Sequence, residues 1–203
     1  MKNPLRNLFT GLLAVAACTA SLVAAPTVGE AAPAFTVKSA AGKEVNLADY
    51  KGKVVVLEWY NPGCPFVKKF YEPGKMQELQ KTYAAKGVVW LTVASANPKN
   101  GAYLDGPALT KSMADAKGAP SAILSDDDGK IARLYDAKTT PHMFVISADG
   151  KLAYKGGIDS KPTPKSDDIA KATPYLANAV DAVLAGKAVE NADTKPYGCS
   201  VKL

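Results

Sequence analysis

The chain has 203 residues, of which 47% are hydrophobic and 22% charged, so it can bury a full core and is not a disordered, highly charged protein. Its formal net charge of +6 comes from 25 basic and 19 acidic side chains without a long run of one sign, which favours a solvated basic surface and no nucleic-acid partner. Three cysteines and one histidine exclude a structural zinc site of four cysteines, or of two cysteines and two histidines, within one chain. We expect one ordinary domain without a cofactor.

The N-terminal residues 1–25 have the pattern of a secretory signal peptide. Lys2 and Arg6 are followed by an uncharged stretch rich in small residues, which is short and weakly hydrophobic for a membrane anchor. We therefore expect a periplasmic or secreted protein. An alternative is a lipobox ending at Cys18, whose lipidation would anchor the protein; a retained anchor is a third possibility. Ordinary cleavage leaves Cys64 and Cys199, an even pair that fits a disulfide or a redox couple.

The rest of the chain alternates strands and helices up to residue 185. Apolar runs and turn signals predict strands, in chain order, at 34–37, 44–47, 53–59, 88–93, 121–124, 143–146 and 151–154. Helical patterns occupy 65–85 (kinked or split at Pro73), 107–117, about 131–135, and 173–185 with Thr173 as N-cap. This order predicts an α/β domain over residues 26–185 with a mixed sheet covered on both faces. Residues 186–203 are polar and aperiodic, so we expect a tail.

Cys64 is the candidate nucleophile. It follows the buried strand 53–59 and a Pro-Gly turn, and it opens a helix. The free N–H groups and the positive end of a helix dipole stabilise a thiolate, which is the reactive form of cysteine. Lys68, one turn on, is close enough to help, and Lys69 less directly. The position favours a reactive thiol over a buried inert one.

Two segments resemble signatures of the thioredoxin superfamily. The segment 58–67, EWYNPGCPFV, resembles the active-site segment, and 139–146, TTPHMFVI, resembles the loop that carries a cis proline. The chain is most similar to the redoxin branch, the alkyl hydroperoxide reductase/thiol-specific antioxidant group of peroxiredoxin-like proteins, over roughly residues 30–185. The resemblance implies a thioredoxin-like fold with a central mixed sheet flanked by helices, an N-terminal β-hairpin and a C-terminal tail. It also implies thiol-dependent reduction of peroxides or protein disulfides, an antioxidant role, and a thioredoxin-type reductant.

The chain departs from both family patterns at the candidate site. Val67 stands where thioredoxins have their second cysteine, so a local dithiol is impossible. Asn61 stands where peroxiredoxins have a threonine, and the region aligned with their arginine, 140–142, has none. Lys68, or Arg133 from another segment, could supply positive charge. The resemblance therefore leaves open whether a peroxide or a protein disulfide is the substrate.

Three further residues acquire expected roles from the resemblance. Glu58 corresponds to the buried acid of thioredoxins, which relays protons to and from the reacting sulfurs; the alternative is an exposed strand end. Pro141 is the expected cis proline, which brings backbone groups of the preceding residue near the cysteine, where an extended substrate could pair. His142 either faces the site, for proton transfer or metal binding, or is half-exposed at a strand start, the reading we favour.

Cys199 is the expected resolving cysteine. It lies in the tail segment 195–201, where Gly198 adds freedom and Pro196 limits helix formation, so a mobile tail could deliver the thiol to oxidised Cys64. The alternatives are a permanent structural disulfide or a link between two chains, so both a monomer and a homodimer remain open. The sequence thus predicts an exported thiol-dependent oxidoreductase. Copper(I) binding by Cys64, Cys199 and His142, or a non-catalytic binding module, are the alternatives.

Overall fold

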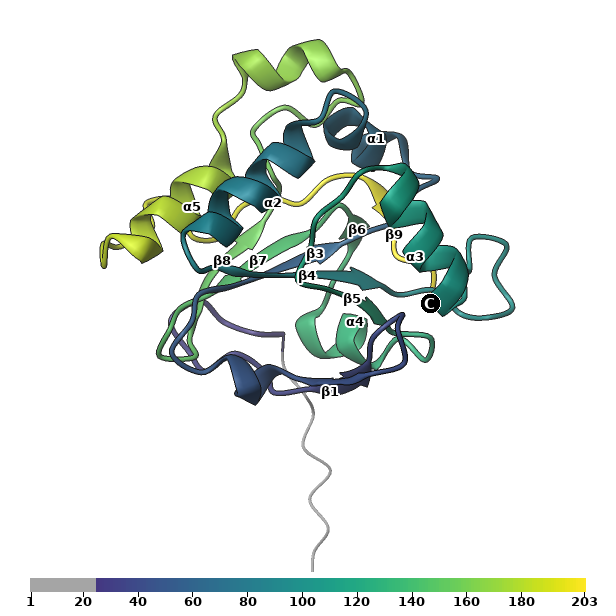
Figure 1. Cartoon of the computed structure of the whole chain (residues 1–203). Coiled ribbons are helices and arrows are strands. Elements are labelled where there is room, and N and C mark those ends of the chain that lie inside the picture. The colour runs from purple at the N-terminus through teal and green to yellow at the C-terminus, as the bar shows by residue number, and fades with distance from the viewer. Residues whose placement is uncertain (1–24) are drawn as a thin grey trace, which may run out of the picture.

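A central five-stranded sheet organises the computed structural model, which describes residues 25–203 (Figure 1). The strand order is β5-β4-β3-β7-β8. The three strands on one side, β3, β4 and β5, are parallel, and β7 and β8 complete the sheet in antiparallel pairs. The bounds are Val55–Trp59 for β3, Val89–Ala94 for β4, Ala122–Ser125 for β5, Met143–Ile146 for β7 and Leu152–Gly156 for β8. The predicted mixed sheet is confirmed.

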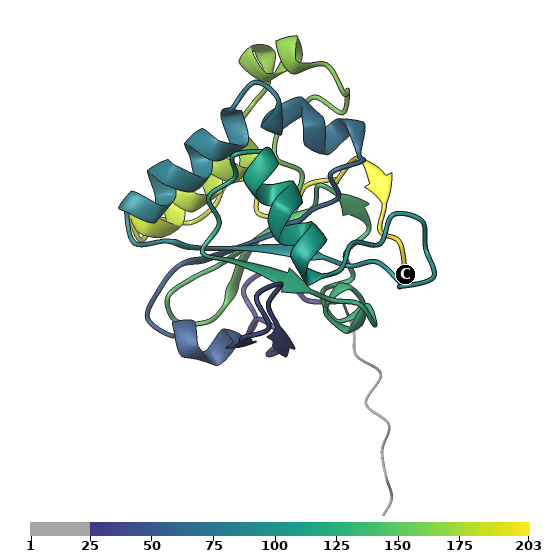
Figure 2. The same cartoon turned by 45° about the vertical axis from the view of Figure 1, so that its right-hand side comes forward.

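Both faces of the sheet are covered, as Figures 1 and 2 show. One face carries the helices α1 (Pro65–Tyr71), α2 (Lys75–Ala85), α3 (Gly106–Asp115) and α5 (Tyr175–Leu184). The other face carries the hairpin of β1 (Thr36–Lys38) and β2 (Glu44–Asn46), the 3-10 helix η1 (Leu47–Tyr50) and the short helix α4 (Lys130–Tyr135). Successive strand side chains point to opposite faces, so Val56 packs into the core under α1 and α2, whereas Leu57 packs into the core under the hairpin. The molecule is thus a three-layer α/β domain of the thioredoxin-like class.

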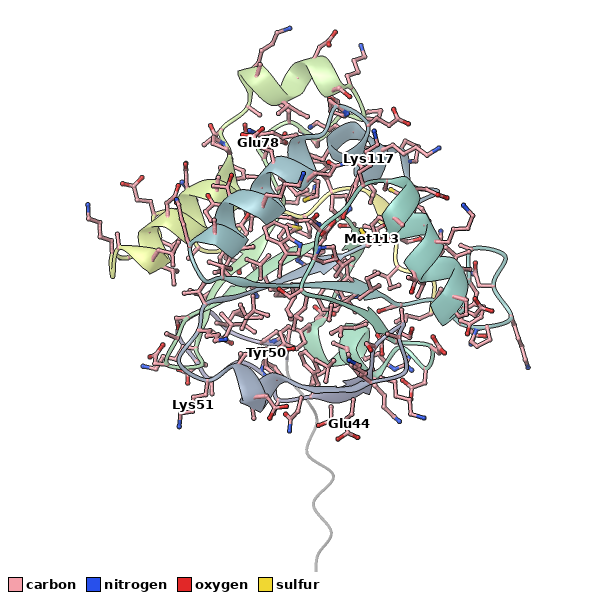
Figure 3. All side chains as sticks on the ribbon, viewed as in Figure 1. Glu44, Tyr50, Lys51, Glu78, Met113 and Lys117 are labelled. Carbon is pink, nitrogen blue, oxygen red and sulfur yellow. The ribbon has the colours of Figure 1, made fainter. Side chains whose placement is uncertain are left out.

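Side chains follow this layering. Met113 of α3 is buried against the sheet, whereas Glu44, Lys51 and Glu78 extend outward into solvent (Figure 3). No helix within residues 25–203 is both long and apolar enough to cross a membrane. The predicted signal peptide and Cys18 lie outside the described residues, except for Ala25.

Pro73 separates α1 from α2, as the sequence predicts. Its ring and missing N–H interrupt a helix, and Gly74, with φ 83°, begins the second one. The start of α5 differs from prediction, because its N-cap is Pro174 rather than Thr173 and no side chain caps it. A 3-10 helix, η2 (Ser166–Lys171), lies in a segment for which the sequence predicts no helix or strand.

The tail follows the body of the molecule instead of lacking regular structure. Its backbone pairs with Lys155 of β8 through Ala192 and Thr194. It then forms β9 (Cys199–Ser200), antiparallel to β6 (Thr139–Thr140), seen as the yellow arrow beside β6 in Figure 1. Beyond β9, the N–H of Asn97 donates to the carbonyl of Lys202. These contacts correct the expectation of a mobile tail.

Candidate active site around Cys64 and Cys199

A tight turn after β3 places Cys64 at the start of α1. The side-chain oxygen of Asn61 accepts from the N–H of Gly63, and its backbone carbonyl accepts from the N–H of Cys64. Cys64 is the N-cap residue, and Pro65 fills the first helical position, where a backbone N–H has no helical partner. Asn61 therefore shapes the turn. The side chain of Cys64 ends up buried, with 1% of the residue exposed.

The tail brings a second thiol to this point. Cys199 pairs with Thr140 across the β6–β9 ladder, next to the Thr140–Pro141 peptide bond, which is cis as predicted. The Sγ atoms of Cys64 and Cys199 are 2.8 Å apart, although 135 positions separate the residues. The Cys64 Sγ also lies 2.9 Å from the carbonyl oxygen of Thr140. One helix start, one loop and one tail strand thus converge on a pair of sulfurs.

The pKa values of the two thiols are shifted in opposite directions. Burial raises the pKa of Cys64, but hydrogen bonds outweigh this effect, so the pKa lies below its ordinary value. These hydrogen bonds come from the side chains of Cys199 and Thr140 and from the N–H groups of Cys199 and Val67. Burial, together with the hydrogen bond to Cys64 and the charge of its thiolate, raises the pKa of Cys199 to about 11. Cys64 is therefore the more acidic thiol of the pair, and Cys199 keeps its proton near neutral pH.

Glu58 is buried completely, as the sequence favours, in the core between β3 and α2. Its carboxylate accepts from four side chains, those of Tyr71, Gln80, Trp90 and Thr92. Burial raises the pKa of Glu58 in spite of these four hydrogen bonds, which lower it. Each of these partners is a side chain of α1, α2 or β4, so Glu58 makes no direct hydrogen bond to either cysteine.

A model of the AhpC/TSA family matches residues 28–155, which is more than half of the chain and includes both signature segments. The chain belongs to the AhpC/TSA family. It is 29% identical over 128 residues to "Thiol-disulfide oxidoreductase ResA" of Geobacillus thermodenitrificans, a match that covers 63% of this chain and 68% of that protein. It is 28% identical over 142 residues to "Putative peroxiredoxin Rv2521" of Mycobacterium tuberculosis, covering 62% and 82%.

A solved structure shares the fold of this chain. The crystal structure of an uncharacterized conserved protein from Geobacillus kaustophilus superposes with a TM-score of 0.73 at 27% identity, over 87% of this chain and 92% of that one. The chain is therefore a thioredoxin-fold member of an oxidoreductase family. The match to the family model ends at residue 155, so the tail with Cys199 lies outside the matched residues.

His142 does not join the sulfurs. It directly precedes β7 and stacks on Phe144, in the core on the hairpin side, with 4.4 Å between ring centroids. It is 5% exposed, so the expected half-exposed position is wrong. Burial lowers the pKa of His142 to about 3, and its Nδ1 accepts from the N–H of Lys138. His142 is therefore a neutral core residue, and residues 25–203 contain no group of three or more metal-binding side chains.

The basic residues considered as aids to Cys64 have different surroundings. Lys68 is exposed on α1, and the interactions that most lower the pKa of Cys64 come from other residues. Arg133 lies on α4 and donates to the carbonyl of Asp128, away from the sulfurs. Lys69 is buried and pairs with Asp159 at 2.9 Å.

Sequence reasoning missed Asp159 and Tyr197. Tyr197 donates to the Asp159 carboxylate, and its ring packs edge-on against Phe66 of α1 with 5.8 Å between centroids. Neither residue belongs to a periodic element, so no pattern identifies it. The one available signal is the position of Tyr197, two residues before Cys199.

Proposed function

We propose that the protein is a thiol–disulfide oxidoreductase that alternates between the dithiol and a Cys64–Cys199 disulfide. The observation that carries this proposal is the 2.8 Å separation of the two Sγ atoms. The lowered pKa of Cys64 and the raised pKa of Cys199 support a division of roles, with Cys64 as nucleophile and Cys199 as resolving thiol. Membership of the AhpC/TSA family and similarity to a ResA protein support the reaction class.

The reaction takes two exchange steps. The Cys64 thiolate attacks one sulfur of a substrate disulfide, which forms a mixed disulfide and releases the other substrate sulfur as a thiolate. Cys199 gives its proton to that leaving thiolate and attacks the Sγ of Cys64, which releases the second substrate sulfur. The substrate gains two electrons, and the protein holds one disulfide. A thioredoxin-type dithiol then reduces that disulfide by the same steps in reverse.

Peroxide reduction is the second candidate, because the family and the Mycobacterium tuberculosis relative point to it. In this case the Cys64 thiolate attacks the O–O bond, becomes a sulfenic acid and releases water after protonation, and Cys199 displaces a second water to form the same disulfide. Asn61 replaces the usual threonine, and Arg133 is engaged on α4. These departures favour disulfide exchange as the main activity.

We also propose that residues 1–25 direct export and are removed, so that the protein acts in a periplasmic or extracellular compartment, where disulfides persist. The charge pattern of these residues supports this proposal. Intact mass of the processed protein tests it. A chain that begins near residue 25 supports ordinary cleavage, a lipid on Cys18 supports the lipoprotein route, and retention of Met1 in exported material contradicts both.

The catalytic proposal is tested by trapping its intermediates. Reduced protein is mixed with a disulfide-containing polypeptide, quenched with acid, and mapped by non-reducing peptide mass spectrometry. Wild type should yield a Cys64–Cys199 peptide, Cys199→Ser should accumulate a mixed disulfide on Cys64, and Cys64→Ser should lose turnover by at least about a thousandfold. Electrophoresis without reductant distinguishes a bond within one chain from one between chains. Undiminished turnover in Cys199→Ser would remove Cys199 from the mechanism, and stopped-flow mixing with hydrogen peroxide measures the second candidate.

A further inference from the structure

A buried ionic cluster fastens the tail beside the active site. Lys69 of α1 is 1% exposed and its ammonium donates to the carboxylate of Asp159, to the carbonyl of Lys161 and to the hydroxyl of Tyr197. Asp159 is 4% exposed and accepts from Lys69, Lys161 and Tyr197. Lysine and aspartate are rarely buried unless each has a partner. Here the paired charges also bind the hydroxyl of Tyr197, which belongs to the tail.

Tyr197 is held from two sides. Its hydroxyl is bound to Asp159 and Lys69, and its ring lies between Phe66 and the Lys69 ammonium, which is 5.3 Å from the ring centroid. Burial and the negative charge of Asp159 raise the pKa of Tyr197, so the phenol keeps the proton that it donates. Buried charges raise the free-energy cost of losing such a partner. Tyr197 therefore attaches the tail through a charged hydrogen-bond network, two residues before Cys199.

The attached strand covers what a partner polypeptide would need. β9 uses the backbone edge of Thr140, and Cys64 beneath it is 1% exposed. An extended segment cannot pair with the same backbone groups while β9 occupies them. Approach of a disulfide carried on a polypeptide therefore requires β9 to leave β6. Because only Gly198 separates Tyr197 from β9, that departure requires Tyr197 to leave Asp159 and Lys69.

We propose that Tyr197, bound by Asp159 and Lys69, is a specificity-determining residue: it holds β9 on β6 and thereby sets how readily Cys64 is exposed to a polypeptide. The substrate class in this statement rests on the proposed function, whereas the control of Cys64 exposure does not. Release of Tyr197 opens the site to large substrates. While Tyr197 is bound, β9 covers Cys64 and large substrates cannot reach it.

Access is measured with alkylating reagents in a Cys199→Ser background. Iodoacetamide and a bulky polyethylene-glycol maleimide are used, the Cys64 peptide is quantified by mass spectrometry, and rates are compared on the high-pH plateau so that a pKa shift cannot imitate opening. Tyr197→Phe keeps the ring but removes the hydroxyl, and it leaves the Lys69–Asp159 pair in place. Tyr135→Phe is the matched control, because it also removes one phenolic hydrogen bond, to the carbonyl of Pro33, on the opposite face of the sheet.

The expected result is alkylation of Cys64 about ten- to hundredfold faster in Tyr197→Phe, with the larger effect on the bulky reagent, because hydrogen bonds to charged groups are stronger than neutral ones. Tyr135→Phe should react at the background rate. The N–H groups of Asn97 and Val201, which donate to Lys202 and Lys138, should exchange with solvent faster in Tyr197→Phe, while amides of β3 stay protected. Unchanged alkylation and unchanged exchange in Tyr197→Phe would overturn the proposal.

Turnover separates this proposal from the proposed function. With Cys199 restored, Tyr197→Phe should raise the rate ratio of a polypeptide disulfide to glutathione disulfide by about tenfold relative to Tyr135→Phe. If no variant reduces either disulfide, the proposed function fails while the alkylation result still decides the role of Tyr197. If both disulfides react but the ratio is unchanged, the specificity role of Tyr197 fails and the proposed function stands.

Discussion

Two cysteines of one site differ in acidity because each occupies a different backbone environment. Cys64 begins a helix, so the N–H of Val67 and the positive end of the helix favour its thiolate. Cys199 lies in a two-residue strand without a helix dipole, and the neighbouring negative sulfur opposes its ionisation. The pair therefore has a built-in direction, in which the more acidic sulfur attacks first.

This difference predicts selective alkylation of the reduced protein. A thiol of pKa about 11, such as Cys199, is only about one ten-thousandth ionised at pH 7. Iodoacetamide should therefore label Cys64 first at pH 7, with a midpoint below the value of about 8.5 for a free cysteine, and should label Cys199 only as the pH approaches its pKa. In Cys199→Ala, the midpoint of Cys64 should rise, because a hydrogen-bond donor to the thiolate is lost. Labelling followed by peptide mass spectrometry checks this, and equal midpoints for the two thiols would contradict it.

At the scale of elements, the sequence predicts the helices and strands that have a hydrophobic period and misses the shortest strands. Pro73 splits the first long helix as expected, and the apolar run before Asn61 forms the central strand. β6 and β9 have two residues each, and two residues carry no hydrophobic period. Their pairing joins Thr140 to Cys199, 59 positions further along the chain, and depends on the path of the tail, which composition alone does not specify. The pairing of Cys64 with Cys199 was predictable from their chemistry, whereas the path of the tail that brings Cys199 to Cys64 was not.

Gly198 makes the pairing of β9 with β6 possible and supplies a test of it. Its φ of 141° suits glycine, and a Cβ there would overlap the carbonyl of Thr140. Gly198→Ala should therefore displace β9 and slow formation of the Cys64–Cys199 disulfide by at least about tenfold, because such a backbone alone costs roughly 1–3 kcal/mol. Quenched-flow thiol trapping measures the rate. Gly186→Ala is the control, since Gly186 also has positive φ, 66°, but no neighbour within reach of a Cβ; an equal loss in both variants would assign the effect to general strain.

At the scale of the whole molecule, a bond between the two sulfurs would close 135 positions of the chain into one loop. All five strands of the central sheet except β3 lie between Cys64 and Cys199 in the chain. The alternation of strands and helices was enough to predict the layers, because connections in such folds are short and right-handed. Closure by the tail was not part of that pattern. A bond between the sulfurs would therefore enclose the five α-helices and most of the central sheet, but not the N-terminal hairpin.

We expect the disulfide form to be more stable than the dithiol form by roughly 2–5 kcal/mol, because linking residues 135 positions apart restricts the unfolded chain. The lower part of this range applies because the folded dithiol form already stabilises the Cys64 thiolate, an advantage that the disulfide gives up. Urea unfolding of the two forms measures the difference. Cys199→Ser should unfold at the same urea concentration with and without oxidant, and coincident curves for both forms of wild type would contradict the expectation.

The separation of Cys64 and Cys199 along the chain also orders events during synthesis. The chain emerges with Cys64 long before Cys199, so β3, α1 and much of the sheet can assemble while the acidic thiol has neither cover nor partner. Foreign thiols and disulfides can reach it during that interval. Arrival of β9 ends the interval, because the same strand that supplies the second sulfur also covers the first. The last residues of the chain thus convert Cys64 from an exposed thiol, which can react with many partners, into one that is paired with Cys199.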